Sequence, residues 1–222
     1  MIDELYALYD IPVSKRKYLI IAPPRTGSSS LLLAIKLATD LKSLSPANSP
    51  FDEKKFLEDL KKYDGVITKM DPCKQSRSFL GKLVKKYDRV VILIRENIVD
   101  HALSNTRAGY YKNYDGVYEI EEETELKVAH KKLKPKVLQS CMKQTFNALQ
   151  LAIQYKIPIL TYEELYTGEG EDLWKTLKEF GIKWKDIGDD KFQKILQIMN
   201  PINKYTNKKS ILKNIKKPIK FL

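Results

Sequence analysis

The sequence predicts an α/β fold with a central parallel sheet that is covered by helices on both faces. Short apolar runs alternate with longer segments of helical periodicity, an order typical of strands joined by right-handed crossovers. The run Val90–Ile94 is apolar throughout, as expected of a parallel strand buried on both faces. Another apolar run, Tyr18–Ala22, passes through a short turn directly into a helical pattern. We therefore expect a three-layer domain that binds its ligand at the carboxyl ends of the strands.

The first part of the chain predicts two strands and two helices. The apolar run 18–22 forms the first strand, and the helical pattern 31–41 follows it. Residues 43–50 predict a loop because they include two prolines and three serines. Residues 51–63 place their apolar side chains on one helical face, and 65–69 form a second short strand.

The middle of the chain continues the alternation. Residues 77–87 carry an apolar stripe with helical spacing, the strand 90–94 follows, and 98–107 are again helical. Residues 108–122 are aromatic and polar, with four tyrosines between positions 110 and 118, and predict a loop or lid. These tyrosines would either stack on a sugar ring or anchor the loop with their hydroxyls in water.

The last part of the chain predicts two helices, one strand and a basic tail. The longest helical pattern is 137–155, followed by the strand 157–161 and the helix 173–180. Residues 203–222 are weakly patterned and rich in lysine. With 222 residues, the chain 1–222 is expected to be a single domain.

Targeting signals and metal-binding patterns are not apparent. The sequence has no run of eighteen apolar residues and no basic-then-apolar N-terminus, so we expect neither a transmembrane segment nor a signal peptide. Its two cysteines, Cys73 and Cys141, are too few for a disulfide framework and show no metal-ligand spacing. We therefore expect a cytoplasmic protein without a metal ion.

The chain is strongly basic, with a formal net charge of +12 from 40 basic and 28 acidic residues. Basic proteins often bind polyanions such as nucleic acid. However, only six of the basic residues are arginines, and the abundance of Lys, Ile, Asn and Tyr is also what an AT-rich genome would impose. A cleft for a multiply phosphorylated nucleotide would use the same charge, so nucleic acid is not the expected partner.

The turn after the first strand has the composition of an anion-binding loop. It reads Pro23-Pro-Arg-Thr-Gly-Ser-Ser-Ser30 and is followed at once by a helical pattern. Backbone N–H groups at a helix N-terminus attract phosphate or sulfate. The serine hydroxyls add donors, and Arg25 adds a fixed cation. The alternative is a tight turn in which Ser28 merely caps the helix.

This loop differs from the nucleotide-binding P-loop, Gly-x-x-x-x-Gly-Lys-Ser/Thr. Ala22 stands in place of the first glycine and Ser28 in place of the lysine, while Arg25 supplies a cation inside the loop. The loop resembles the 5′-phosphosulfate loop of sulfotransferases that use 3′-phosphoadenosine 5′-phosphosulfate (PAPS). The resemblance implies a P-loop-like fold and PAPS as co-substrate, held by Arg25, Thr26, Gly27, Ser28, Ser29 and Ser30.

A second basic position follows the strand 90–94. Arg95 stands at the strand end, and Ser104 lies about two turns into the next helix. The pair resembles the 3′-phosphate-binding segment of sulfotransferases, in a phrasing close to that of bacterial carbohydrate sulfotransferases. The alternative is that Arg95 pairs with Glu96 or Asp100 on the surface. The segment Thr161-Tyr-Glu-Glu-Leu165 is similar to a family segment whose role is mainly structural, so we assign it no chemistry.

The resemblance implies sulfuryl transfer from PAPS to a hydroxyl acceptor, with carbohydrate as one candidate. Arg25 would neutralise the leaving group. Lys69 aligns with the lysine of a family Lys-Thr-His motif, which places Asp71 where the family has its basic histidine. Asp71 is therefore a candidate base, although Asp71-Pro72 would equally open a turn. Weaker candidates for the base are Asp52, Glu53, His101 and His130.

Two other functions remain open from the sequence. A P-loop-type kinase of small molecules would bind ATP and Mg²⁺, but the missing loop lysine argues against it. A basic nucleic-acid-binding module would bind with steep salt dependence and would not need Arg25. The Lys-rich segment 203–222 would either fold over the nucleotide, as in several sulfotransferases, or remain solvated.

Overall fold

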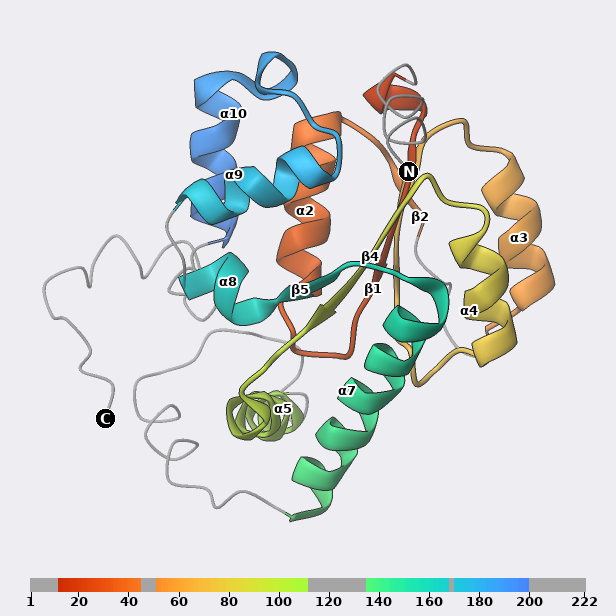
Figure 1. Cartoon of the computed structure of the whole chain (residues 1–222), viewed down its shortest axis with the longest axis vertical. Helices are drawn as coiled ribbons and strands as arrows, with labels where there is room; N and C mark the ends of the chain where they lie inside the picture. The colour runs from red at the N-terminus through yellow and green to blue at the C-terminus, as the bar shows by residue number, and fades with distance from the viewer. Residues whose placement is uncertain (1–11, 45–50, 112–134, 168–169, 200–222) are drawn as a thin grey trace, which may run out of the picture.

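The structure is a computed structural model, and it describes residues 12–44, 51–111, 135–167 and 170–199 (Figure 1). The Lys-rich segment 203–222 and residues 112–122 of the tyrosine-rich segment lie outside the described residues, so the predictions made for them stay predictions. Among the helices that the structure describes, none combines the length and apolar character needed to cross a membrane.

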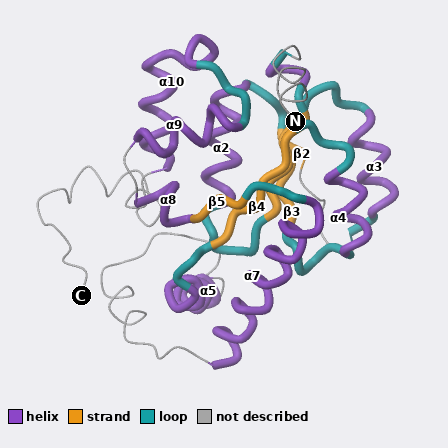
Figure 2. The backbone as a smooth tube through the Cα atoms, in the orientation of Figure 1, coloured by secondary structure: helices purple, strands orange, loops and turns teal. Residues whose placement is uncertain are grey.

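A parallel five-stranded sheet forms the centre of the molecule (Figure 2). Its strands, in the spatial order β2-β3-β1-β4-β5, are β1 (Lys17–Ile21), β2 (Ser43–Leu44), β3 (Val66–Met70), β4 (Arg89–Ile94) and β5 (Ile159–Thr161). The central strand β1 pairs with both β3 and β4, with Ile21 opposite Met70 on one side and Ile92 on the other. The carboxyl ends of these three strands therefore lie side by side.

Helices cover both faces of the sheet, as predicted (Figure 1). They are α2 (Ser28–Thr39), α3 (Glu53–Lys61), α4 (Arg77–Val84), α5 (Ile98–Tyr111), α7 (Pro135–Tyr155), α8 (Tyr162–Thr167), α9 (Gly170–Glu179) and α10 (Trp184–Met199), after a 3₁₀ turn η1 (Val13–Lys15). Because side chains alternate along a strand, Tyr18 and Ile20 of β1 face a core with α2, α8, α9 and α10. Leu19 and Ile21 face a second core with α3, α4 and α7.

The structure corrects several element boundaries. Ser43 and Leu44 are not loop but the edge strand β2, which pairs with β3. Helix α5 continues to Tyr111, so the first residues of the expected 108–122 loop are helical, and α4 ends at Val84 rather than at 87. Helices α8 and α10 were not predicted. A two-residue strand and a six-residue helix are too short to produce a periodic pattern.

Candidate functional site

Three strand ends form one edge of the sheet, where open α/β sheets bind their ligands. The loop after β1 lies between the end of β3 and the end of β4. A cavity of about 220 Å³ opens here, and the described residues that line it are Arg25, Gly27, Ser28, Ser29, Ser30, Arg95, Ser104 and Tyr162. All predicted nucleotide-binding residues except Thr26 are in this lining, and Tyr162 was not foreseen.

The loop after β1 adopts a strained, tightly packed path. Arg25 and Gly27 have φ angles of 68° and 84°, in the left-handed region. Gly27, not Ser28, is the N-cap of α2, and no side chain caps this helix. A Cβ atom at Gly27 would lie 2.5 Å from Cε2 of Tyr166, so any larger residue would force the Tyr166 ring to move. Ser30 N already donates to Gly27 O at 2.9 Å, so the donors left for an anion at the start of α2 are the backbone N–H groups that precede it, those of Ser28 and Ser29.

Three carbonyl groups of this loop are held by side chains. Thr26 Oγ1 donates to Pro23 O (2.9 Å), His101 Nε2 bonds to Pro24 O (2.8 Å), and the Tyr166 hydroxyl donates to Gly27 O. Since Pro24 O only accepts, His101 carries its proton on Nε2. Burial lowers the pKa of His101, although the bond to Pro24 opposes this shift. Burial also raises the pKa of Tyr166, so its hydroxyl remains a donor. Thr26, whose hydroxyl bonds to Pro23 O, therefore supports the loop and does not line the cavity.

Two cations lie at this loop: Arg25, which belongs to it, and Lys69, which reaches it from β3. Arg25 Nε donates to Ser104 Oγ on α5, at 3.4 Å, so the loop and the predicted second anion site touch. Lys69 Nζ, from β3, donates to Ser29 Oγ at 2.8 Å. Burial lowers the pKa of Lys69, and the nearby Asp71 carboxylate opposes this shift. Lys69 on β3 and Ser29 in the loop, which are both predicted site residues, are therefore in contact.

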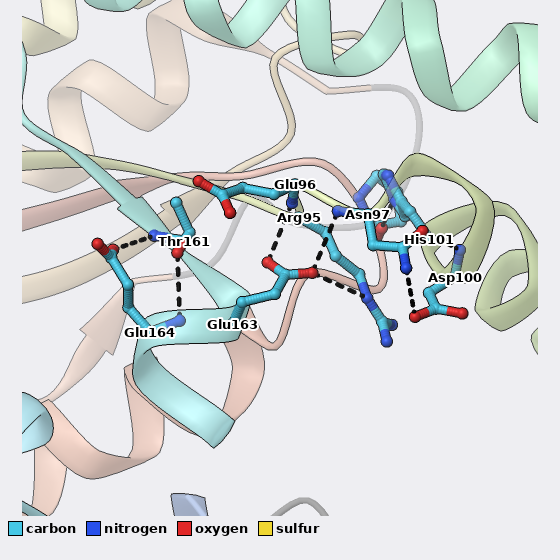
Figure 3. Close-up of polar contacts among 9 residues, drawn as sticks. Arg95, Glu96, Asn97, Asp100, His101, Thr161, Glu163 and Glu164 are labelled. Carbon is cyan, nitrogen blue, oxygen red and sulfur yellow. Dashed lines mark hydrogen bonds and ion pairs between the residues drawn. The ribbon is translucent and has the colours of Figure 1, made fainter. Parts of the chain in front are cut away.

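Arg95 is held by two residues of α8, Tyr162 and Glu163, rather than by its own neighbours in the sequence (Figure 3). Its side chain is 14% exposed, its Nε lies 3.8 Å from Glu163 Oε1, and its guanidinium carbon lies 4.3 Å from the centre of the Tyr162 ring. Asp100, the surface partner considered from the sequence, instead accepts from the Asn97 side chain. Within the described part of the chain, the ion-pair partner of Arg95 is Glu163, and no ion pair joins Arg95 to Glu96 or Asp100.

Asp71 lies at the turn after β3, outside the cavity lining formed by the described residues. Its Oδ1 accepts a hydrogen bond from Cys73 N at 2.9 Å, which is the turn role considered from the sequence. The carboxylate keeps further lone pairs, so this turn does not preclude a role as base. Of the weaker candidates, Asp52 caps α3 and Glu53 accepts from Ser76; His130 lies outside the described residues.

Sequence reasoning missed the contribution of α8 to this site. Tyr162 lines the cavity, Glu163 lies beside Arg95, and Tyr166 holds the loop after β1. One signal was available, because Thr161-Tyr-Glu-Glu164 fits the capping box that often begins a helix. Tyr162 and Tyr166 are then four residues apart and fall on one helical face, where their rings stack at 4.5 Å.

Comparison with known proteins identifies the fold. No protein-family model and no curated protein sequence matches this chain. Among solved structures, the chain is similar to the crystal structure of mouse sulfotransferase SULT7A1 complexed with PAP. The two share 16% sequence identity at a TM-score of 0.56, and the match covers 92% of this chain and 70% of the other. The protein therefore has a sulfotransferase fold, a P-loop-like α/β arrangement, as the sequence predicts.

Proposed function

We propose that this protein is a PAPS-dependent sulfotransferase that acts on a hydroxyl acceptor. In this reaction the acceptor oxygen forms a bond to sulfur, and the bond between sulfur and the bridging phosphate oxygen breaks. The electron pair of that bond remains on the 5′-phosphate of the product PAP (3′,5′-adenosine bisphosphate). The acceptor proton passes to a base.

One observation carries the proposal: two arginines from different strand ends line the same cavity. Arg25 lies in the loop after β1, Arg95 directly follows β4, and Ser104 on α5 accepts a hydrogen bond from Arg25. A single anion loop suits any phosphate, whereas two cations at neighbouring strand ends suit a ligand with two separate anionic groups. PAPS carries such groups at its 5′ and 3′ positions. The likeness to a sulfotransferase complexed with PAP supports this assignment.

The side chains fit such a ligand in charge and in donor capacity. Arg95 Nε is buried and makes no hydrogen bond within the part of the chain that the structure describes, so part of its donor capacity is unused. The N-terminus of α2 lacks a side-chain cap, and Ser28, Ser29 and Ser30 surround it. A 5′-phosphosulfate at this helix start would gain backbone N–H contacts and the positive end of the helix dipole.

Each residue then has a definable task. Arg25 and the N–H groups of Thr26 to Ser29 stabilise the negative charge that develops on the leaving phosphate. Lys69 donates to Ser29 and adds a second cation beside the leaving group. Arg95 and Ser104 bind the 3′-phosphate. These contacts contribute mainly by positioning the sulfuryl group in line with the acceptor.

Asp71 is the proposed base. It follows β3 by one residue and lies close enough to Lys69 to influence the pKa of that lysine. A carboxylate beside the acceptor oxygen accepts its proton as the bond to sulfur forms. A carbohydrate hydroxyl is the first acceptor class to test, because the sequence between Arg95 and Ala108 resembles that of carbohydrate sulfotransferases.

Calorimetric titration with PAP, ATP–Mg²⁺ and a DNA oligonucleotide tests this function. We expect micromolar binding of PAP, lost in both Arg25→Ala and Arg95→Ala, and release of PAP from PAPS in the presence of hydroxyl acceptors. Preference for ATP–Mg²⁺ would instead support a kinase. Salt-dependent DNA binding that survives Arg25→Ala would support a nucleic-acid-binding module.

A further inference from the structure

The carboxylate of Glu163 connects the start of α8 to the turn between β4 and α5 (Figure 3). Its Oε2 accepts a hydrogen bond from Glu96 N at 3.0 Å, and its Oε1 accepts one from Asn97 N at 3.2 Å. The same Oε1 lies 3.8 Å from Arg95 Nε. One side chain thus holds three successive residues of the turn that carries the second predicted anion site.

Neither adjoining helix needs Glu163 as a cap. Helix α8 begins with its own reciprocal pair, because Glu164 N donates to Thr161 Oγ1 and Thr161 N donates to Glu164 Oε2, both at 3.2 Å. Helix α5 also begins with a local cap, in which Asp100 N donates to Asn97 Oδ1 at 3.1 Å. The additional bonds of Glu163 therefore serve the turn around Arg95 rather than the formation of either helix.

Arg95 lies where two consecutive residues of α8 act on it. The Tyr162 ring lies 4.3 Å from the guanidinium carbon, and the Glu163 carboxylate lies beside Nε. An arginine whose charge is flanked by a ring and a carboxylate loses less side-chain freedom when it binds an anion, because its orientation is already restricted. Glu163 also holds the backbone next to Arg95, because its carboxylate accepts hydrogen bonds from Glu96 N and Asn97 N.

We propose that Glu163 is a positioning residue that sets the preference of this site for nucleotides with a 3′-phosphate. This inference rests on the proposed function, in which Arg95 binds that phosphate. Glu163 does not contact the ligand; it acts through Arg95 and through the turn that begins with Arg95. Removing its charge therefore weakens the binding of PAP and leaves the binding of adenosine 5′-phosphate, which lacks the 3′-phosphate, nearly unchanged.

The test is a double-mutant cycle read by calorimetry with both nucleotides. Glu163→Gln retains the size of the side chain but loses the charge and one of its two acceptor oxygens. Groups in contact are coupled by an amount that corresponds to about threefold to tenfold in affinity for a pair of this kind. We expect PAP affinity to fall by that factor, and the affinity for adenosine 5′-phosphate to change by less than about twofold. In an Arg95→Ala background, Glu163→Gln should have no further effect on PAP.

Glu164→Gln provides the matched control. It makes the same chemical change one residue along the same helix, where the carboxylate accepts from Thr161 N. Glu164→Gln should lower the melting temperature slightly and leave the ratio of PAP to adenosine 5′-phosphate affinities unchanged. Glu163→Asp, which keeps the charge on a shorter stem, should restore part of the ratio that Glu163→Gln loses.

The outcomes separate this inference from the proposed function. If the unmodified protein does not bind PAP, or if Arg95→Ala binds it normally, the proposed function fails. If Arg95→Ala loses PAP while Glu163→Gln keeps the full ratio, only the role of Glu163 is refuted. A loss that is equal for both nucleotides, or that persists in the Arg95→Ala background, also refutes it. Should Glu163→Gln not fold, Glu163→Ala, which also removes the charge, takes its place, and an unchanged ratio there refutes the inference.

Discussion

Replacement of Gly27 by alanine tests whether Tyr166 and the loop after β1 form one packed unit. Gly27 has a φ of 84°, and a Cβ atom there would lie 2.5 Å from Cε2 and 2.7 Å from the hydroxyl oxygen of Tyr166. An L-residue in the left-handed region costs about 1–2 kcal/mol. If the Tyr166 ring moves away, its hydrogen bond to Gly27 O is also lost, at about 1 kcal/mol. We expect Gly27→Ala to lower the free energy of unfolding by about 2–3 kcal/mol.

The same substitution in a Tyr166→Ala background offers a matched control for the backbone contribution. Gly27 has φ 84° and ψ 0° in both proteins, but without the Tyr166 ring a Cβ atom at position 27 loses its closest contact. In that background Gly27→Ala should therefore cost only the left-handed backbone strain, about 1–2 kcal/mol. Urea unfolding gives both values, with equal m-values as the condition for comparing them. The difference between the two costs measures the collision with Tyr166 and the lost hydrogen bond.

Nucleotide affinity provides a second readout. Gly27 is the N-cap of α2, so Gly27→Ala should weaken PAP binding by at least tenfold, whereas Gly188→Ala, where a Cβ atom would meet nothing within 4 Å, should leave it unchanged. An equal cost of Gly27→Ala with and without the Tyr166 ring would refute the packing of Tyr166 against the loop.

Three further predictions concern side chains around the loop. Tyr166→Phe removes the hydroxyl and with it the donor to Gly27 O, so urea unfolding should show a loss of at least about 1 kcal/mol, and no loss would contradict the bond. Burial lowers the pKa of His101, so the unfolded chain takes up a proton first as the pH falls below about 6.5, and stability falls with it. His101→Gln, which keeps a donor for Pro24 O, should reduce the loss of stability between pH 8 and pH 5. If the variant and the unmodified protein lose stability equally over this range, His101 is not the cause. Asp71→Asn should reduce turnover at least a hundredfold with PAP affinity within about twofold, and unchanged turnover would remove Asp71 from the mechanism.

The parts of the site that could be predicted are those with a local signal. The turn Pro23–Ser30 combines glycine, prolines and hydroxyl residues between a strand and a helix, and each of these features acts within a few residues. Arg95 was found because a fully apolar strand ends there, and Ser104 because helical periodicity places it two turns further on. The existence and type of the longer helices and strands are determined largely by such patterns.

The contacts that support the loop have no local signal. Tyr166 is 139 positions from Gly27, and His101 is 77 positions from Pro24. A histidine on a helix and a tyrosine after a strand fit many arrangements, and only the packing of β4 and β5 beside β1 selects this one. For the same reason, nothing near Arg95 in the sequence identifies Glu163 as its partner.

Helix α8 explains how the two proposed anion-binding elements, which follow β1 and β4, are placed at a defined spacing. The loop after β1 and the turn after β4 are formed by different parts of the chain, and each could shift along its own strand. Tyr166 holds Gly27 O, Tyr162 packs on Arg95, and the two rings stack at 4.5 Å. A displacement of either element therefore disturbs the same pair of rings. Since a ligand with anionic groups at both ends requires a fixed distance between its two sites, a short rigid helix is better suited to this task than a loop.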